Sequence, residues 1–130
     1  MLNIIVKGDF NVIKHTACNK PICNFHINKA IYYTYQNYTE PLNIEKMAKY
    51  LGINKCYFCQ LFKKETGKTY SQFRNEIRIE KSKELLKNTD MSILDIALSV
   101  GYNNQNYYTM AFKKITGVTP LKYRNLKLAQ

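Results

Sequence analysis

The sequence is short of acidic residues and of histidine. Only 9 Asp and Glu stand against 20 Lys and Arg, which gives a formal net charge of +11, and no acidic residue follows Asp95. A shortage of acidic residues of this size indicates a polyanionic partner, and a requirement for solubility alone would not explain it. With 2 histidines and no motif that combines a nucleophile with a base, the sequence argues against an enzyme and predicts no cofactor.

Long apolar runs are missing as well. No stretch of about 18 apolar residues is present to span a bilayer, and the first residues lack the charged start, apolar middle and small-residue cleavage site of a signal peptide. We therefore expect a cytoplasmic protein with no membrane partner. The 130 residues suffice for one domain, or for two small lobes that share a helix.

Helical spacing of apolar residues begins at about His26 and continues to the end of the chain. Residues 1–25 show short β-like runs and no helical period, so we interpret them as a tail, a linker or the remnant of a sensor domain. Residues 26–130 form the predicted helical domain. The expected helices are 27–37, 44–51, 55–66, 70–88, 92–100, 104–116 and 120–127.

The chain contains an internal repeat. The run from Phe62 to Arg74, FKKETGKTYSQFR, returns as FKKITGVTPLKYR from Phe112 to Arg124, at an offset of 50 residues. Upstream of it, Ala48 and Gly52 correspond to Ala97 and Gly101 at an offset of 49. Two similar units therefore lie in tandem, and the second carries one additional residue.

Each unit has the spacing of a helix-turn-helix. A short amphipathic helix is followed by Gly52 or Gly101, where a left-handed residue can reverse the chain. Asn54 or Asn104 then caps the next helix. The sequence thus predicts an all-α fold of seven helices in two helix-turn-helix lobes, with a first unit over 44–66, a linker helix over 70–88 and a second unit over 92–116.

The second helix of each unit has one face to bury and one to present to a DNA major groove. Phe58, Leu61 and Phe62 are the expected buried residues of helix 55–66, and Tyr108, Ala111 and Phe112 those of helix 104–116. The outward side chains predicted to read bases are Cys56, Cys59, Gln60, Gln105, Asn106, Thr109 and Met110. The predicted phosphate contacts are Lys55, Lys63, Asn104, Lys113 and Lys114.

About three quarters of the chain, from Asn28 to Leu126, resembles the DNA-binding domain of the AraC/XylS family of transcriptional regulators. The resemblance rests on RIEKSKELL from Arg78, ILDIA from Ile93, VGY from Val100, FKKITGVTP from Phe112, and Tyr123-Arg124. It implies two helix-turn-helix lobes whose helices 55–66 and 104–116 enter successive major grooves of double-stranded DNA, about 34 Å apart. It further implies activation of transcription through contact with RNA polymerase.

The sequence departs from the family at several positions, and it leaves alternatives open. Cys56, Cys59, Met110 and Ser82 replace residue types that are more usual there, so base preference cannot be copied from relatives. Cys18 and Cys23, together with Cys56 and Cys59, admit a metal site or a thiol switch, although the prediction is that no metal is bound. A protein-interaction anti-regulator on the same fold is a further alternative. Two reading helices on one chain permit binding as a monomer, so the fold does not require a dimer, and the sequence does not determine the oligomeric state.

Overall fold

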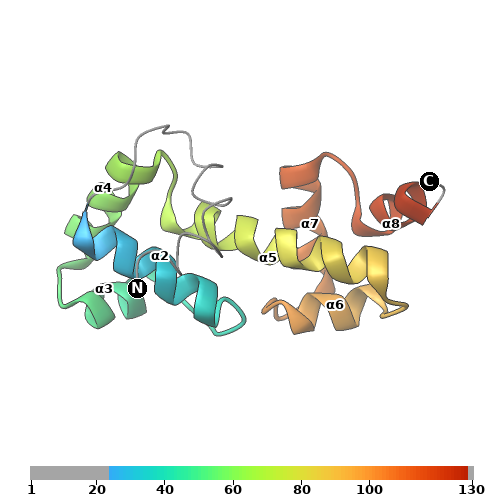
Figure 1. The fold of residues 1–130 in the computed structure, drawn as a ribbon, viewed down its shortest axis with the longest axis horizontal. Coiled ribbons are helices and arrows are strands. Elements are labelled where there is room, and N and C mark those ends of the chain that lie inside the picture. Colours follow the sequence, from blue (N-terminus) through green and yellow to red (C-terminus); the bar gives the residue numbers. More distant parts are fainter. Residues whose placement is uncertain (1–23, 129–130) are drawn as a thin grey trace. The chain divides into compact units, whose positions relative to one another are not determined.

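The computed structural model describes residues 24–128, which are helical throughout apart from turns and short connections. Seven helices follow one another, and no strand occurs within this range, which confirms the predicted all-α fold (Figure 1). They are α2 (Phe25–Asn37), α3 (Ile44–Leu51), α4 (Lys55–Thr66), α5 (Tyr70–Asn88), α6 (Ile93–Ser99), α7 (Gln105–Thr116) and α8 (Pro120–Leu128). None of these helices combines the length and apolarity needed to cross a membrane.

The chain divides into two compact units, each with its own core. Within the described residues, unit 1 comprises the chain up to Asn37 together with Leu42–Arg74, and unit 2 comprises Tyr38–Pro41 and the chain from Asn75 onward. Helix α5 thus contributes its first residues to unit 1 and the rest to unit 2. This division agrees with the predicted pair of lobes joined by a linker helix.

Unit 1 is built around aromatic rings. Phe58 and Phe62 of α4 lie 5.6 Å and 5.5 Å from the Tyr70 ring, measured between ring centroids, and Phe73 lies 5.4 Å from Phe62. The buried hydroxyls of Thr34 and Tyr70 share a hydrogen bond of 2.7 Å, which satisfies both groups away from water. Helices α2, α3 and α4 pack on one another around this centre.

Unit 2 has an equivalent core. Tyr108 and Phe112 of α7 are fully buried, and the Phe112 ring lies 5.4 Å from that of Tyr123 in α8. Aliphatic residues complete the cluster, including Ile79, Leu86, Ile96, Ala97 and Val100. The core therefore fixes α7 between α6 and α8 and leaves one side of α7 outside it.

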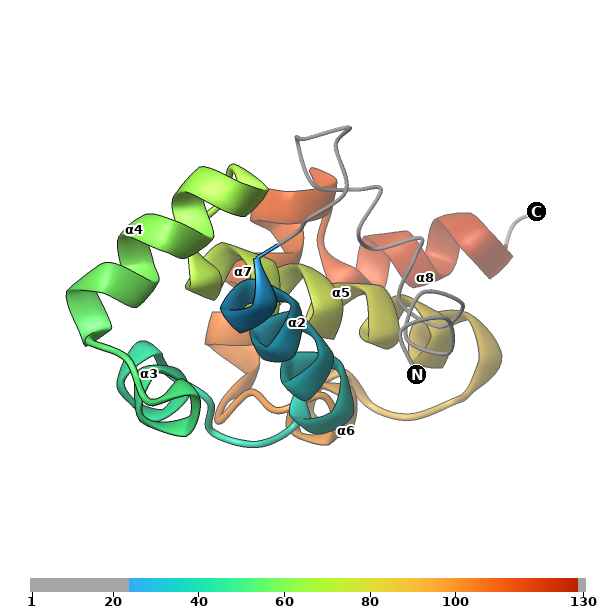
Figure 2. The same ribbon diagram turned by 60° about the vertical axis from the view of Figure 1, so that its left-hand side comes forward.

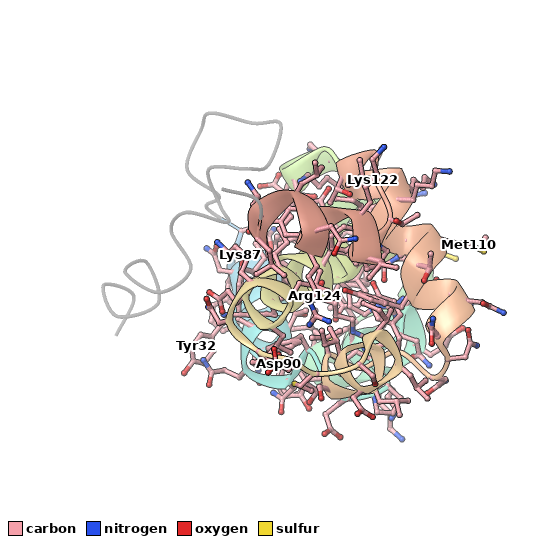
Figure 3. The ribbon with its side chains drawn as sticks, turned by 90° about the vertical axis from the view of Figure 1, so that its right-hand side faces the viewer. Tyr32, Lys87, Asp90, Met110, Lys122 and Arg124 are labelled. Carbon is pink, nitrogen blue, oxygen red and sulfur yellow. The ribbon has the colours of Figure 1, made fainter. Side chains whose placement is uncertain are left out.

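Two arginines of unit 2 serve the fold. Arg78 is buried, and its Nε and Nη2 each donate a hydrogen bond of 2.7 Å, to the carbonyls of Tyr38 and Glu40. Arg124 donates hydrogen bonds of 3.0 Å and 3.2 Å to the carbonyls of Leu86 and Thr89, at the C-terminal end of α5 (Figure 3). Arg124 therefore satisfies carbonyls at a helix end, a role that its position at the end of the repeat did not predict.

Side chains cap the starts of α4, α5, α7 and α8, including the predicted Asn54 and Asn104. The side-chain oxygens of Asn54 and Asn104 accept hydrogen bonds from the first backbone amides of α4 and α7. Thr69 and Gln72 make a reciprocal capping box at the start of α5, with bonds of 2.9 Å and 3.1 Å. The Thr119 hydroxyl accepts from the Lys122 amide and begins α8. Local sequence signals thus determine where these helices start.

The additional residue of the second unit lies inside its turn. The amide of Ile53 donates to the carbonyl of Ala48, and the amide of Tyr102 donates to the carbonyl of Ala97. Ile53 and Tyr102 are therefore equivalent, and they are still 49 residues apart. The caps Asn54 and Asn104 are already 50 residues apart. The insertion therefore falls between Tyr102 and Asn104, outside both helices, and the helix-turn-helix tolerates it.

Ionisation of Tyr108 should make unit 2 less stable in alkali. Burial raises the pKa of Tyr108 to about 12, whereas an unfolded tyrosine ionises near pH 10. The fold consequently favours the protonated phenol, and this stabilisation is complete below about pH 10 and is lost as pH rises towards about 12. We expect Tyr108→Phe to reduce the fall in the free energy of unfolding across that window.

Urea unfolding at a series of pH values measures this effect. Tyr32→Phe is the matched control, because Tyr32 is an exposed tyrosine of unit 1. At pH 7 the Tyr108→Phe protein should unfold within about 1 kcal/mol of the wild type, since its ring still fills the core. An unchanged alkaline slope in Tyr108→Phe would refute the assignment.

Candidate nucleic-acid interface

Helix α4 separates cleanly into a buried side and an outer side. Phe58 and Phe62 are fully buried, and α4 packs on α3, where Met47 and Ala48 are buried. Leu61, which we expected to be buried, is only half-buried. Figure 2 shows α4 along its length, joined to α3 by the short turn that contains Gly52 and Asn54.

The outer side of α4 carries the residues predicted to face DNA. Cys56 and Gln60 are exposed, Cys59 is half-buried, and Lys55 and Lys63 are exposed towards opposite ends of the helix. The side chains predicted to read bases are thus all outside the core of unit 1. Their contact with bases stays a prediction.

Lys55 already has a partner within unit 1. Its Nζ lies 2.8 Å from Oε2 of Glu45, and both side chains are more than half exposed. The hydrogen bond from Lys55 lowers the pKa of Glu45, and the hydrogen bond to Glu45 raises the pKa of Lys55. Exposed pairs of this kind are weak. A DNA phosphate would therefore compete with Glu45 for this lysine.

Helix α7 repeats the arrangement in unit 2. Tyr108, Ala111 and Phe112 are buried as predicted. On the other side, Thr109 is half-buried and Met110 is 72% exposed, and its side chain points away from the body of the unit (Figure 3). The remaining predicted contacts on this helix are all exposed, namely Gln105, Asn106, Lys113 and Lys114.

Asn104 has a structural role that restricts its predicted contact with phosphate. Its Oδ1 accepts a hydrogen bond of 2.7 Å from the Tyr107 amide and caps α7. The side-chain oxygen is therefore engaged in the fold. A phosphate contact would have to use the Nδ2 group of Asn104, which is a hydrogen-bond donor and suits an anion.

Sequence analysis missed one pair of residues on these helices. Tyr57 and Tyr107 occupy equivalent positions of α4 and α7, 50 residues apart, and are 50% and 51% exposed. Each follows the capping asparagine by three residues, next to the positive end of its helix. Their recurrence in the repeat was the signal that would have singled them out. A phenolic hydroxyl in this position suits a phosphate oxygen.

Two of the four cysteines lie among the residues that the structure describes. Cys56 and Cys59 are free thiols on α4. Cys18 and Cys23 lie outside the described residues, as does most of the predicted N-terminal segment 1–25. Within residues 24–128, no three His, Cys, Asp or Glu side chains come close enough together to hold a metal ion.

Removing the carboxylate beside Lys55 should increase affinity for DNA. In Glu45→Gln the lysine loses its partner and a negative charge disappears from the surface that carries α4. We expect binding to duplex DNA to tighten by a few-fold, and the slope of log affinity against log salt to steepen by about one.

Glu80→Gln is the matched control for this measurement by fluorescence anisotropy. Glu80 makes a similar exposed ion pair of 2.9 Å with Lys83, but on α5, and its loss changes the net charge by the same amount. Equal tightening in both variants would mean that total charge, and not release of Lys55, is responsible.

Comparison with known proteins agrees with this arrangement. Residues 47–126 match the family model described as a helix-turn-helix domain. Over 103 residues the chain is 35% identical to an HTH-type transcriptional regulator of Pseudoalteromonas carrageenovora, which covers 79% of this chain. The chain spans 61% of the length of that relative, and 34% of the length of the melibiose operon regulatory protein of Escherichia coli, which it also matches.

Solved structures give the same result. The C-terminal domain of AraT, a response regulator from Geobacillus stearothermophilus, superposes with a TM-score of 0.77 at 34% identity and covers 79% of this chain and 86% of its own. The DNA-binding domain of AdpA, solved in complex with a target DNA, has a TM-score of 0.76 over 82% of this chain and 96% of its own. At 20% identity, that second likeness shows the fold alone. The chain belongs to the helix-turn-helix family of AraC-type DNA-binding domains of transcriptional regulators.

Proposed function

We propose that the chain binds double-stranded DNA with α4 and α7, each inserted into a major groove, and thereby regulates transcription from a promoter. One observation carries the proposal. Both copies of the repeat bury the same two aromatic positions, Phe58 and Phe62 in α4 and Tyr108 and Phe112 in α7, and leave the opposite side of a capped helix polar and exposed. A merely solvated surface would not require this arrangement twice.

The exposed side chains supply the chemistry of base recognition. The amides of Gln60, Gln105 and Asn106 can pair with adenine through one donor and one acceptor, and Met110 and Thr109 can contact a thymine methyl. Neither helix presents an arginine outward, the residue that most often reads guanine. We therefore propose a site rich in A·T pairs, with Cys56 and Cys59 as further base contacts.

The phosphate contacts set affinity rather than sequence preference. We assign them to Lys55, Lys63, Lys113 and Lys114 and to the Nδ2 group of Asn104, and we add the hydroxyls of Tyr57 and Tyr107. Lysine at these positions gives an attraction that falls steeply with salt and does not depend on sequence. The DNA complex of the AdpA domain supports a duplex as the ligand of this fold.

Further parts of the proposal follow from the family. We propose that the chain acts in the cytoplasm as an activator that contacts RNA polymerase, that it is not an enzyme, and that residues 26–130 form the DNA-binding domain. Because one chain holds both reading helices, we propose that a monomer is sufficient for binding. Light scattering of the complex with a single site tests this stoichiometry.

Selection from a random duplex library tests the central proposal. The purified chain is used at about 150 mM salt in reductant, and the affinity for the enriched sequence is then compared with that for a scrambled duplex. We expect a two-part motif whose affinity is at least about 1,000-fold higher than that of the scrambled duplex. Enrichment of no sequence, with only weak salt-sensitive binding, would favour the protein-interaction alternative.

A further inference from the structure

The two thiols of α4 share the surface that is proposed to read bases. Cys56 is the second residue of the helix and is exposed, and Cys59, half-buried, follows three residues later. Residues three apart in a helix are neighbours on one face. They are the only cysteines among the described residues.

Helix geometry makes a bond between these two sulfurs feasible but strained. Cα atoms three residues apart in an α-helix are separated by about 5 Å, which lies inside the range seen in disulfides. The corresponding Cβ atoms are about 5–6 Å apart, whereas a disulfide needs about 3.5–4.5 Å. The first turn of α4 would have to tighten. Strained disulfides are reduced more readily than relaxed ones, so this pair suits a reversible change.

Two lysines of α4 lie near the thiols, and one of them, Lys55, is paired with Glu45 at 2.8 Å. The Lys55 ammonium lies close enough to interact electrostatically with both Cys56 and Cys59. Lys63, exposed one turn further along α4, adds a second positive charge on this side. The thiolate is the form that attacks peroxides, and Cys56 is exposed where a peroxide can reach its sulfur.

We propose that Cys56 and Cys59 form an oxidation site through which a peroxide lowers the affinity of α4 for DNA. The Cys56 thiolate attacks the O–O bond, takes one oxygen as sulfenic acid and releases the other as an alcohol or water. The Cys59 thiol then attacks the Cys56 sulfur, the S–S bond forms and water leaves. The two thiols together give two electrons to the peroxide, and a dithiol reductant reverses the change. The inference rests on the proposed function of α4.

The expected loss of affinity is partial. A disulfide removes two side chains from the reading surface and strains the turn that Asn54 caps, so α4 no longer fits its groove. The contacts of α7 stay available. We expect oxidation to weaken specific binding by at least about tenfold, equivalent to the loss of one good base contact.

The test uses the full chain in a C18S/C23S background, which leaves only the pair on α4. Intact mass is measured after treatment with hydrogen peroxide, and the affinity for the selected duplex is measured before treatment, after it and after reductant. We expect the mass to fall by two hydrogens, the affinity to drop by at least about tenfold, and both to return with reductant. In the same background C59S should stop at a sulfenic acid on Cys56, which dimedone traps.

Three results would overturn the inference. The mass could stay constant under peroxide, or the disulfide could form while affinity stays unchanged. Alternatively, peroxide could lower the affinity of C56S/C59S, in the same background, by the same factor as it lowers that of its parent. That result would assign the effect to another group, such as the exposed Met110. The mass measurement needs no DNA, and the reduced protein is tested for specific binding first. Failure of the proposed function is therefore distinguishable from failure of the thiol chemistry.

Discussion

Replacing Gly101 with alanine is expected to destabilise unit 2 by about 2–5 kcal/mol, through backbone strain and overpacking together. Gly101 has φ of +108°, a conformation that L-residues with a side chain rarely adopt. A Cβ on this residue would lie 2.9 Å from Nε of Arg78 and 3.0 Å from Cα of Thr39. Arg78 cannot move away easily, because it is buried and holds the carbonyls of Tyr38 and Glu40.

Gly52→Ala is the matched control, since Gly52 occupies the equivalent turn of unit 1. Its φ is also positive, at 71°, but a Cβ there would meet nothing within 4 Å. We expect a cost of only about 1–2 kcal/mol, which is the strain of a left-handed alanine. Urea unfolding of both variants gives the comparison. Equal losses would show that the contacts with Arg78 and Thr39 do not matter.

The second large effect is expected at the reading surface of α7. Gln105→Ala should weaken binding to the selected duplex by about 5- to 150-fold, the equivalent of about 1–3 kcal/mol, and should leave binding to scrambled DNA nearly unchanged. The reason is that Gln105 is proposed to pair with a base, whereas both duplexes present the same phosphates. The measurement is anisotropy with both duplexes over a range of salt concentrations.

Lys113→Ala is the control for this prediction. Lys113 is exposed on the same helix, and its proposed partner is a phosphate. Its loss should weaken binding to both duplexes alike and reduce the salt slope by about one. An equal loss on both duplexes for Gln105→Ala would remove that residue from base recognition.

Much of the fold could be predicted because its signals are local. The helix starts at Asn54, Thr69 and Asn104 each depend on a side chain that bonds to backbone two or three residues away. The repeat located both helix-turn-helix units, and the apolar spacing separated Phe58 and Phe62 from the exposed side of α4. Information of this kind is contained in short stretches of sequence.

The remainder depends on residues that are far apart in the chain. Arg78 reaches carbonyls about 40 residues earlier, and Arg124 closes the end of α5 from a distance of 35 residues or more. Lys55 meets Glu45 across the turn between α3 and α4. No spacing rule anticipates such contacts, because the tertiary fold creates them. For the same reason Arg78, Arg124 and Lys55, which the sequence alone shows only as basic residues, have different roles.

The two copies of the repeat retain the same interior and differ on the outside. Phe58 and Phe62 correspond to Tyr108 and Phe112, but the outward Cys56, Cys59 and Gln60 correspond to Asn106, Thr109 and Met110. In the proposed function the two halves of the chain therefore recognise different half-site sequences in DNA. The operator should lack two-fold symmetry, and a monomer should bind to it in a single orientation. Inverting the operator in a promoter would reverse the end of the protein that faces the start of transcription.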